Sequence, residues 1–399
     1  MQRFFLALLL LALTAPLMPG AAKPLVSDVR VGLHGEATRC GRDLSEPGPC
    51  RVFTLPDPYR LVIDLPELIW NLPPELPPAK KGLVGALRFG LFSPGVSRVV
   101  LDLTGPAAVG RVEQLPPTAD GKHRLFVDLA PVSDAAFNEP GARQTLQSAE
   151  PLPQTASIPT PAAPPEQGDK RPLIVIDAGH GGIDPGATGV AGVLEKKLVL
   201  DYALELKKQI EASGDYRVQL TRETDLFIPL RDRYAMAEES AADLFISLHA
   251  NIHAKSSIRG ASVFTLSEKG ADSDAEAAAL ADKANAADAL AGVADSDDVA
   301  VILGDLMRRE TMNLSKNLAN RLVDEIGEEA KLLKNTHRFA NFAVLRSPTV
   351  PSVLIEIGYM SNAAEEEQLR GKKHRKAVAG AILRAIDSYF SWQEALNRS

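Results

Sequence analysis

Residues 173–186 read Leu-Ile-Val-Ile-Asp-Ala-Gly-His-Gly-Gly-Ile-Asp-Pro-Gly. The apolar run that opens this stretch predicts a short, buried strand over 173–177. The glycines around His180 predict a turn in which the backbone can approach a bound group closely. The stretch therefore predicts a sheet strand that ends in a polar, histidine-bearing turn.

Strands and amphipathic helices alternate from this stretch to the end of the chain. The next helix is expected at 195–212, where apolar residues fall on one face and Gly214 follows as a cap. A last helix is expected at 375–390. This alternation is typical of an α/β domain, which we place at 171–392 with a mixed, mostly parallel sheet flanked by helices. The further strands are expected at 217–220, 244–248, 261–266 and 353–357.

One segment, 271–312, interrupts the alternation. It opens with a stretch rich in alanine and acidic residues, 272–292, and closes with a second apolar-periodic segment, as expected for a pair of helices. We interpret it as a helical insertion in the α/β domain.

The stretch 25–132 has a different character, because apolar and polar residues alternate between turn signals. It predicts a small all-β sandwich domain ahead of the α/β domain. The segments 60–65, 98–103 and 124–129 share one pattern, Arg, three apolar residues, Asp and Leu. Each is a candidate buried strand. Its Arg and Asp either pair at strand ends or contact a ligand.

Two further segments lie outside these domains. Residues 133–170 are rich in Pro, Ala, Gln, Ser and Thr, which predicts an extended linker. Residues 1–22 have a basic start, an apolar run over 4–14 and a small-residue end, as in a Sec signal peptide. The run is short for a membrane anchor, so we expect export to the periplasm and no membrane span after cleavage.

Net charge and cysteine content give two further expectations. The net charge of −7 excludes a general nucleic-acid binder, which would need clustered positive charge. Cys40 and Cys50 lie close together in an exported chain, so we expect a local disulfide, with two thiols as the alternative.

Candidate metal ligands stand at the predicted strand ends. His180 follows the first strand, Glu195 starts the following helix, and His249 ends a later strand within Ser-Leu-His-Ala-Asn. Two nitrogens, one carboxylate and an open position for water suit a catalytic zinc ion. Because the strand ends of α/β sheets form binding crevices, we expect the three side chains to converge. His253, four residues after His249, has the spacing of a second ligand on a helix, but the chain lacks a His-Glu-x-x-His pattern there, so we expect His253 at the surface or behind the ligands.

Glu356 lies inside the apolar strand Val-Leu-Ile-Glu-Ile, at 353–357. A buried carboxylate has a raised pKa, which suits a group that shuttles a proton. We therefore expect Glu356 to be the general base. The alternative is a salt bridge with an arginine inside the domain.

The motifs around these residues occur in the order found in one enzyme family. Residues 173–390 resemble the zinc-dependent N-acetylmuramoyl-L-alanine amidases of the Amidase_3 family. The resemblance places the metal ligands on His180, Glu195 and His249, and the catalytic glutamate on Glu356. The matching pieces include 176–186, 195–197, 221–225, 230–233, 247–251 and 355–362.

The resemblance implies a hydrolase that cleaves the amide between N-acetylmuramic acid and L-alanine in peptidoglycan, with Zn²⁺ as cofactor. Zinc would polarise the carbonyl and acidify a water, and Glu356 would carry the proton to the leaving amine. The alternatives are a zinc carboxypeptidase acting on wall peptides and a non-catalytic wall-binding protein.

The β domain is similar to the AMIN domain of exported cell-envelope proteins, through the Arg-to-Asp-Leu strands and Val84-Gly-Ala-Leu-Arg-Phe-Gly. This implies binding of peptidoglycan at the division septum. Related division amidases carry a helical insertion that covers the site until an activator, expected to be a LytM-domain protein, displaces it. Some relatives place a glutamate where this chain has Ala284, so Glu276 and Asp282 are the remaining candidates for capping the metal.

Overall fold

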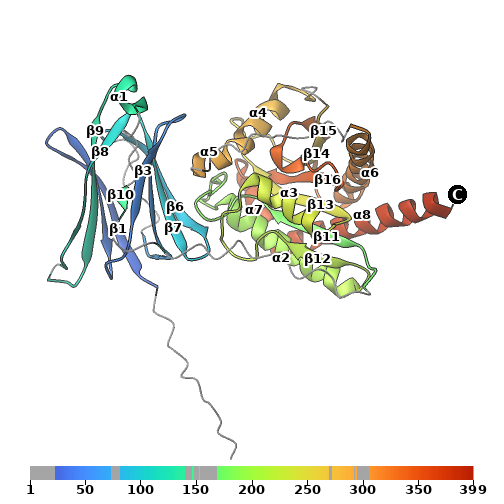
Figure 1. Cartoon of the computed structure of the whole chain (residues 1–399). Coiled ribbons are helices and arrows are strands. Elements are labelled where there is room, and N and C mark those ends of the chain that lie inside the picture. Colours follow the sequence, from blue (N-terminus) through green and yellow to red (C-terminus); the bar gives the residue numbers. More distant parts are fainter. Residues whose placement is uncertain are drawn as a thin grey trace, which may run out of the picture.

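The computed structural model describes two domains (Figure 1). The described residues are 23–72, 81–117, 119–139, 146–147, 152, 169–268, 272–291, 293 and 305–398. The expected signal peptide, 1–22, lies outside them, as does most of the expected linker. No helix among the described residues is long and apolar enough to cross a membrane.

The N-terminal domain is a sandwich of two five-stranded sheets. Sheet A has the order β5-β1-β2-β9-β8, and sheet B has the order β10-β3-β4-β7-β6. Their inward side chains form one apolar core, as the alternating sequence pattern predicts. The strands are β1 (Leu25–His34), β2 (Ala37–Leu44), β3 (Arg51–Leu55), β4 (Arg60–Pro66), β5 (Ile69–Trp70), β6 (Val84–Ser93), β7 (Val96–Leu103), β8 (Ala107–Leu115), β9 (His123–Pro131) and β10 (Leu146–Gln147).

The repeated Arg-to-Asp-Leu segments are β4, β7 and β9, and arginines pair with their aspartates. On sheet B, Arg98 of β7 pairs with Asp64 of β4 at 2.6 Å. On sheet A, Arg39 of β2 pairs with Asp128 of β9 at 2.7 Å. Asp64 and Asp128 therefore serve cross-strand pairing.

Two short elements lie inside the segment 133–170 that we expected to be a linker. Helix α1 (Asp134–Asn138) buries Phe137 against Tyr59, with ring centroids 5.0 Å apart, and β10 pairs with β3. The apolar side chain of Phe137 explains why the chain stays on the sandwich beyond residue 133.

Cys40 and Cys50 are both buried and carry thiols, not the disulfide that we expected. Cys40 belongs to sheet A, whereas Cys50 directly precedes β3 of sheet B. Burial raises the pKa of Cys40 to about 12. Each thiol also lies within the electrostatic reach of Arg42, and Cys50 receives a weak hydrogen bond from Gln114.

The C-terminal domain is built on a six-stranded mixed sheet of order β12-β11-β13-β16-β14-β15. The first four strands are parallel, while β14 runs antiparallel to β16 and parallel to β15. This confirms the predicted fold class. The strands are β11 (Leu173–Ala178), β12 (Arg217–Leu220), β13 (Leu244–Asn251), β14 (Ala261–Leu266), β15 (Leu332–Ala340) and β16 (Ser352–Tyr359).

Helices cover both faces of this sheet. Helices α2 (Glu195–Ser213), α6 (Asp305–Glu329) and α8 (Lys372–Arg398) pack on the face that carries Ile174 and Ile176. On the opposite face, α3 (Leu230–Glu239), α4 (Ala275–Asn285) and the short 3₁₀ helix η1 (Ala343–Leu345) pack around Val175. Because both faces are covered, the central strands β11 and β16 are buried along their whole length, whereas the edge strands β12 and β15 carry polar residues. Two further helices are α5 (Ala287–Ala291) and α7 (Ala363–Arg370).

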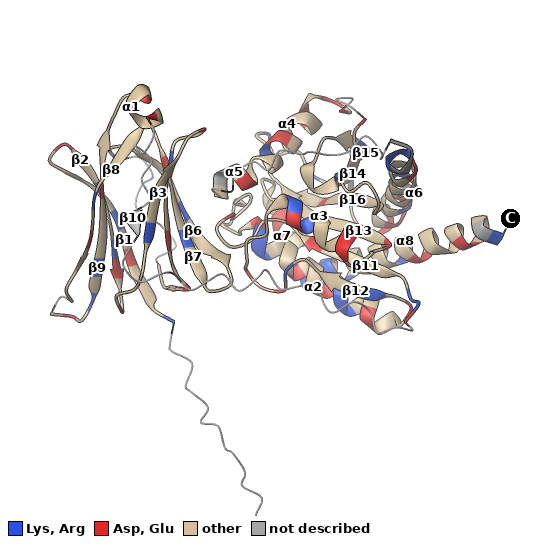
Figure 2. Ribbon diagram, in the orientation of Figure 1, with Lys and Arg blue, Asp and Glu red and all other residues tan. Residues whose placement is uncertain are grey.

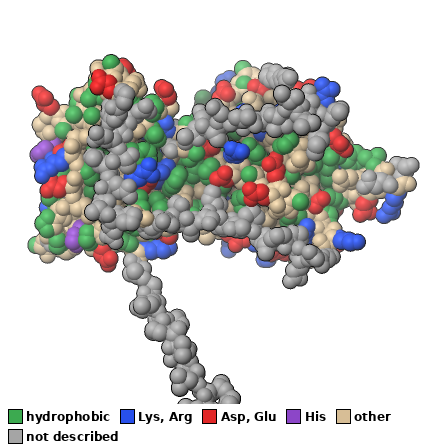
Figure 3. All heavy atoms as spheres, in the orientation of Figure 1, with side chains coloured by type: hydrophobic (Ala, Val, Ile, Leu, Met, Phe, Trp, Pro, Cys, Tyr) green, Lys and Arg blue, Asp and Glu red, His purple; other side chains and the backbone are tan. Residues whose placement is uncertain are grey.

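The expected insertion 271–312 contains α4 and α5, but its C-terminal end lies within α6. Helix α6 is part of the domain core, because Leu318, Leu322 and Ile326 are buried beside the sheet. Acidic and basic residues are interspersed along the ribbon (Figure 2), and side chains of both signs appear on the face drawn in Figure 3.

Candidate active site and metal centre

The His180 turn is held by a buried network at the end of β11. Asp177 is fully buried and accepts hydrogen bonds from Thr221, Arg233 and Ser247 at 2.7–2.8 Å. Arg233 also donates to the carbonyl oxygen of His180 at 2.9 Å. The opposite charges of Asp177 and Arg233 compensate each other in the core, and their hydrogen bonds hold the turn in one position. His180 has a φ of +59°, a conformation that non-glycine residues seldom adopt outside functional sites.

Three side chains predicted from the sequence converge above this network. Oε1 of Glu195, from the first turn of α2, lies 3.0 Å from Nε2 of His180 and 3.1 Å from Nδ1 of His249. The donor atoms of the three residues all lie within 4.8 Å of one another. In the described part of the chain, no other group of His, Cys, Asp or Glu is so arranged.

Close packing of backbone around the site needs glycine at two positions. A Cβ atom at Gly179 would lie 2.4 Å from the ring of His249. At Gly186, whose φ is +66°, it would lie 2.7 Å from both Glu195 and His180. The glycine-rich turn therefore allows both histidines and the glutamate to share one small volume.

The donor set fits zinc. Ligands about 2.0–2.2 Å from a tetrahedral zinc ion lie roughly 3.3 Å from one another, close to the separations of Glu195 from the two histidines. Asp184 accepts a hydrogen bond from Nδ1 of His180 at 2.7 Å, so that Nε2, on the side of Glu195, is the ring nitrogen available to a metal once it is deprotonated. A carboxylate behind a histidine ligand is the usual support of zinc sites.

The pKa shifts of Glu195 and His180 are consistent with a site for a cation. Burial alone would raise the pKa of Glu195, but His180 and His249 lower it well below the ordinary value. Burial lowers the pKa of His180, while Asp184 and Glu195 outweigh it and raise that pKa to about 10. Two negative groups thus surround His180. The cluster is arranged to hold positive charge.

Glu356 lies beside the triad, directly opposite His249 in the register of β16 and β13. Glu356 is 3% exposed, and its Oε2 has no hydrogen-bond partner among the residues that the structure describes. Burial, assisted by the charge of Glu195, raises its pKa well above the ordinary value. No ion pair among the described residues involves Glu356, in contrast to the salt bridge considered as its alternative role.

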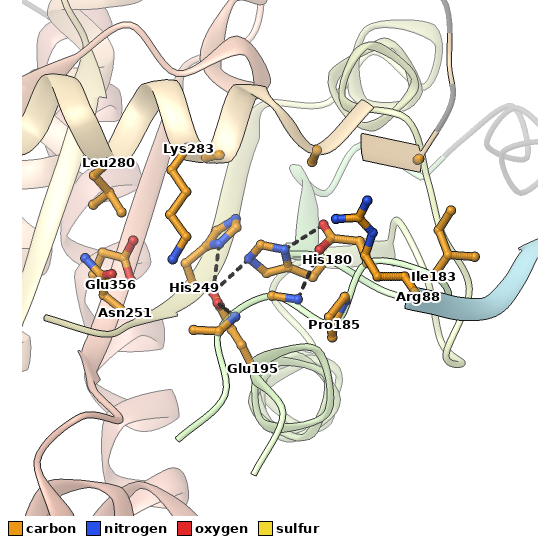
Figure 4. A pocket seen from close by; sticks show the side chains of 16 residues that line it. Arg88, His180, Ile183, Pro185, Glu195, His249, Asn251, Leu280, Lys283 and Glu356 are labelled. Atoms are coloured by element: carbon orange, nitrogen blue, oxygen red, sulfur yellow. Dashed lines mark hydrogen bonds and ion pairs between the residues drawn. The ribbon is translucent and has the colours of Figure 1, made fainter. Parts of the chain in front are cut away.

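These residues line one cavity of about 150 Å³ (Figure 4). His180, Glu195, His249 and Glu356 form its floor and side. Several lining residues were not predicted from the sequence as parts of the site, and they come from three other places. Asp184 and Asn251 are neighbours of the triad in sequence, Leu280, Lys283, Ala284, Ala287 and Ala291 come from α4 and α5, and Arg88 comes from β6 of the sandwich.

The candidate capping residues of the insertion do not join the triad. Glu276 lies near His253 and Arg338, at 3.9 and 3.7 Å, and Asp282 is exposed. His253 is likewise outside the metal group among the described residues. Lys283 instead points from α4 into the pocket, toward His249 and Glu356 (Figure 4).

Comparison with known proteins assigns the family. Residues 174–388 match the model of the Amidase_3 family, N-acetylmuramoyl-L-alanine amidase, and residues 43–130 match the AMIN domain. The chain is 37% identical to the N-acetylmuramoyl-L-alanine amidase AmiC of Neisseria meningitidis, over 85% of this chain and 83% of that protein. It is 34% identical to AmiC of Escherichia coli, over 93% of this chain and 91% of that protein.

Among solved structures, N-acetylmuramoyl-L-alanine amidase AmiC2 of Nostoc punctiforme is 26% identical, covering 56% of this chain and 99% of that one, with a TM-score of 0.42. The family matches and the AmiC relatives cover both domains of the chain. The chain therefore belongs to the N-acetylmuramoyl-L-alanine amidases of the Amidase_3 family and carries an N-terminal AMIN domain.

Proposed function

We propose that His180, Glu195 and His249 hold a zinc ion, and that Glu356 is the general base with which this amidase hydrolyses peptidoglycan. The observation that carries the proposal is the convergence of three zinc-type donors within 4.8 Å, beside a buried carboxylate with a raised pKa. A bound zinc ion would polarise the scissile carbonyl and acidify a water molecule.

Glu356 supplies the proton transfer that this hydrolysis needs. Its carboxylate takes a proton from the attacking water and delivers it to the nitrogen of L-alanine, which leaves as a free amine. An unpartnered oxygen and a raised pKa suit a group that must both accept and release a proton. Glu195 has no such freedom, because both of its oxygens accept hydrogen bonds from backbone amides.

The products and the metal dependence test this proposal together. Purified sacculi treated with the protein should release intact stem peptides with a free L-alanine amino group. Chelation should abolish that release, and added zinc should restore it. Release of single amino acids would instead identify a carboxypeptidase, and full activity after complete metal removal would refute the zinc site.

We further propose that α4 and α5 block the pocket in the resting enzyme. Leu280, Lys283 and Ala284 line the cavity from the side opposite the triad, and the ammonium group of Lys283 occupies space that a substrate would need. This block is steric and electrostatic. It uses no metal-capping carboxylate, in keeping with Ala284 at the position where some relatives have glutamate.

The insertion is held in place by hydrogen bonds near the pocket. Asn285 donates to the carbonyl oxygen of Asn341 at 2.8 Å and accepts from the amide of Ala343 at 2.7 Å. Asp288 accepts from the amide of Leu230 at 2.9 Å. Ala277 and Ala281 of the same segment are buried in the domain core, so deleting 271–310 would damage the fold as well as open the site.

Substitution is therefore a sharper test than deletion. The double variant Asn285→Ala/Asp288→Ala should raise the basal release of stem peptides by about five-fold or more, since coupling of 1–3 kcal/mol corresponds to 5–150-fold. Asp282→Ala, an exposed change on the same helix, is the matched control. A folded, zinc-loaded double variant with unchanged activity would contradict the blocking role.

The enzyme's site of action is also proposed. We infer that residues 1–22 direct export to the periplasm, that the sandwich domain over 25–132 directs the enzyme to septal peptidoglycan, and that a LytM-domain protein displaces the insertion. The AMIN match over 43–130 and the AmiC relatives support this view. A fluorescent fusion that lacks 25–132 should lose enrichment at the septum, and septal enrichment without the sandwich would refute its targeting role.

A further inference from the structure

Sheet B lies on the side of the sandwich that faces the catalytic domain (Figure 1), and Arg88 of β6 lines the pocket. Leu91 of β6 forms a parallel bridge with Leu226, and its carbonyl oxygen accepts a hydrogen bond from the amide of Phe227 at 3.3 Å. The rings of Phe92 and Phe227 stack with centroids 5.9 Å apart. The two domains are therefore joined by backbone pairing as well as by side chains.

An apolar cluster is shared between the domains. Val62 of β4 and Val100 of β7 point outward from the sandwich, because their neighbours in sequence point into its core. Outward positions of a sandwich are usually polar. Here both valines are fully buried against Ile183, Phe227 and Ala291 of the catalytic domain. Their apolar character is explained by this contact.

Arg98 connects the sandwich to the insertion. It pairs with Asp64 through two hydrogen bonds, and its Nη1 donates to the carbonyl oxygen of Ala291 at 2.8 Å. Its guanidinium lies 3.4 Å from the ring centroid of Phe92. Ala291 is the last residue of α5. A buried, charge-assisted hydrogen bond thus holds the C-terminal end of α5.

Arg88 of β6, on the same sheet, reaches the catalytic pocket. It pairs with Asp102 of β7 and lines the cavity together with His180 and Ile183 (Figure 4). A side chain of the sandwich is therefore part of the wall of the catalytic pocket. The sandwich and the insertion meet at Ala291, which lines the same cavity.

We propose that the outer face of sheet B is an intramolecular docking surface for the catalytic domain and for Ala291 at the end of α5. The docked sandwich then closes the active site together with α4 and α5. Arg98 holds Ala291, the shared cluster buries the end of α5, and Arg88 closes one side of the cavity. Opening the pocket then requires the sandwich to leave. This inference rests on the proposed blocking role of α4 and α5.

Gly90 offers a direct way to separate the domains. A Cβ atom at Gly90 would lie 2.3 Å from the carbonyl carbon of Gly182, and its three nearest atoms all belong to Gly182 and Ile183. A leucine side chain therefore cannot enter the docked interface without displacing it. Gly41, on β2 of the opposite sheet, has no atom within 4 Å of such a Cβ and provides the matched control.

We expect Gly90→Leu in the full-length protein to increase the radius of gyration measured by X-ray scattering. Hydrogen exchange of the backbone amides over 275–291 should become faster by about five-fold or more. Release of stem peptides from sacculi should rise in parallel. Gly41→Leu should change none of the three. Phe92→Ala, which removes the stack without adding bulk, serves as a second variant if Gly90→Leu does not fold.

The outcomes separate this inference from the proposed blocking role. If Gly90→Leu changes the scattering but leaves the exchange of 275–291 unchanged, the sandwich does not hold the insertion. If folded variants keep the dimensions of the unsubstituted protein, the docking surface itself is wrong. A third outcome is that Gly90→Leu makes hydrogen exchange over 275–291 faster but does not raise the release of stem peptides. If Asn285→Ala/Asp288→Ala is then also no more active than the unsubstituted protein, the docking inference stands and the blocking role fails.

Discussion

Two glutamates face the same pocket, and their surroundings differ. Glu195 is enclosed by positive or hydrogen-bonding groups, with both oxygens satisfied by His180, His249 and two backbone amides. Glu356 is equally buried, but its Oε2 has no partner. The pKa of Glu195 is lowered and that of Glu356 is raised. One residue type thus stands in two different environments, which suit the two roles proposed for it, metal ligand and general base.

The difference follows from where each glutamate stands in the fold. Glu195 begins α2 and reaches back over the His180 turn. Glu356 lies within β16, an apolar strand that is buried along its whole length. Glu195 accepts hydrogen bonds from the amides of Ala187, in the turn before α2, and of Ala250 in β13, whereas Oε2 of Glu356, inside an apolar strand, has no such partner. The predictions below test this division of roles.

The largest effect is expected for Glu195→Gln. Loss of the anionic ligand should remove most of the bound zinc and reduce stem-peptide release roughly 10⁴-fold or more, beyond the range expected for a lost general base. Metal analysis by mass spectrometry and turnover on sacculi measure the two effects. Full zinc occupancy in this variant would show that Glu195 is not a ligand.

A smaller loss is expected for Glu356→Asp. The shorter side chain withdraws the carboxylate by about 1 Å, and a misplacement of that size costs about 10²-fold in rate. Zinc content should stay unchanged. Glu238→Asp, on the far part of α3 where Glu238 accepts a hydrogen bond from Ser347, is the control and should keep normal turnover.

Asp184→Asn tests the support behind His180. Burial would raise the pKa of Asp184, but its contact with His180 lowers that pKa to about 2, so the carboxylate is charged in the working enzyme. Its replacement should weaken zinc binding by about 10–100-fold, with near-normal turnover once zinc is saturating. Titration with a competing chelator measures the affinity, and an unchanged zinc affinity would remove Asp184 from the metal centre.

The smallest effect concerns stability. Glu356→Gln replaces a buried group whose ionised form lacks a partner, so the zinc-free protein should gain about 1 kcal/mol in the free energy of unfolding. Denaturation in urea after chelation measures this gain. Glu195→Gln should show the reverse, because it removes a well-partnered carboxylate. Destabilisation by Glu356→Gln would argue that Glu356 has a structural partner.

Much of the fold and the triad follows from the sequence. Long apolar strands such as 173–177 and the periodic helix at 195–212 carry strong local signals, and strand ends of an α/β sheet meet at one edge. The edge strand β15 was not predicted, since its sequence, Leu-Leu-Lys-Asn-Thr-His-Arg-Phe-Ala, is largely polar. The start of α6 was assigned to the insertion because its apolar periodicity was interpreted as the second helix of an inserted pair, whereas it begins a long helix of the domain core.

The remaining pocket residues could not be predicted in the same way. Asp184 has a local signal, four residues after His180 within one glycine-rich turn, but its role depends on the positive φ of His180. Arg88 and Lys283 come from another domain and from the insertion. Their positions depend on tertiary docking. The outward valines at 62 and 100 are a trace of that docking in the sequence, but they stand within strands expected to be buried and so gave no separate signal.

The most direct test of the central claim is the zinc content of Glu356→Gln measured together with its turnover on purified sacculi. Full zinc occupancy with stem-peptide release reduced by about 10²–10⁴-fold is the expected result, because only the proton transfer is lost. Loss of zinc together with activity would make Glu356 a ligand, and normal turnover at full zinc occupancy would exclude it as the general base.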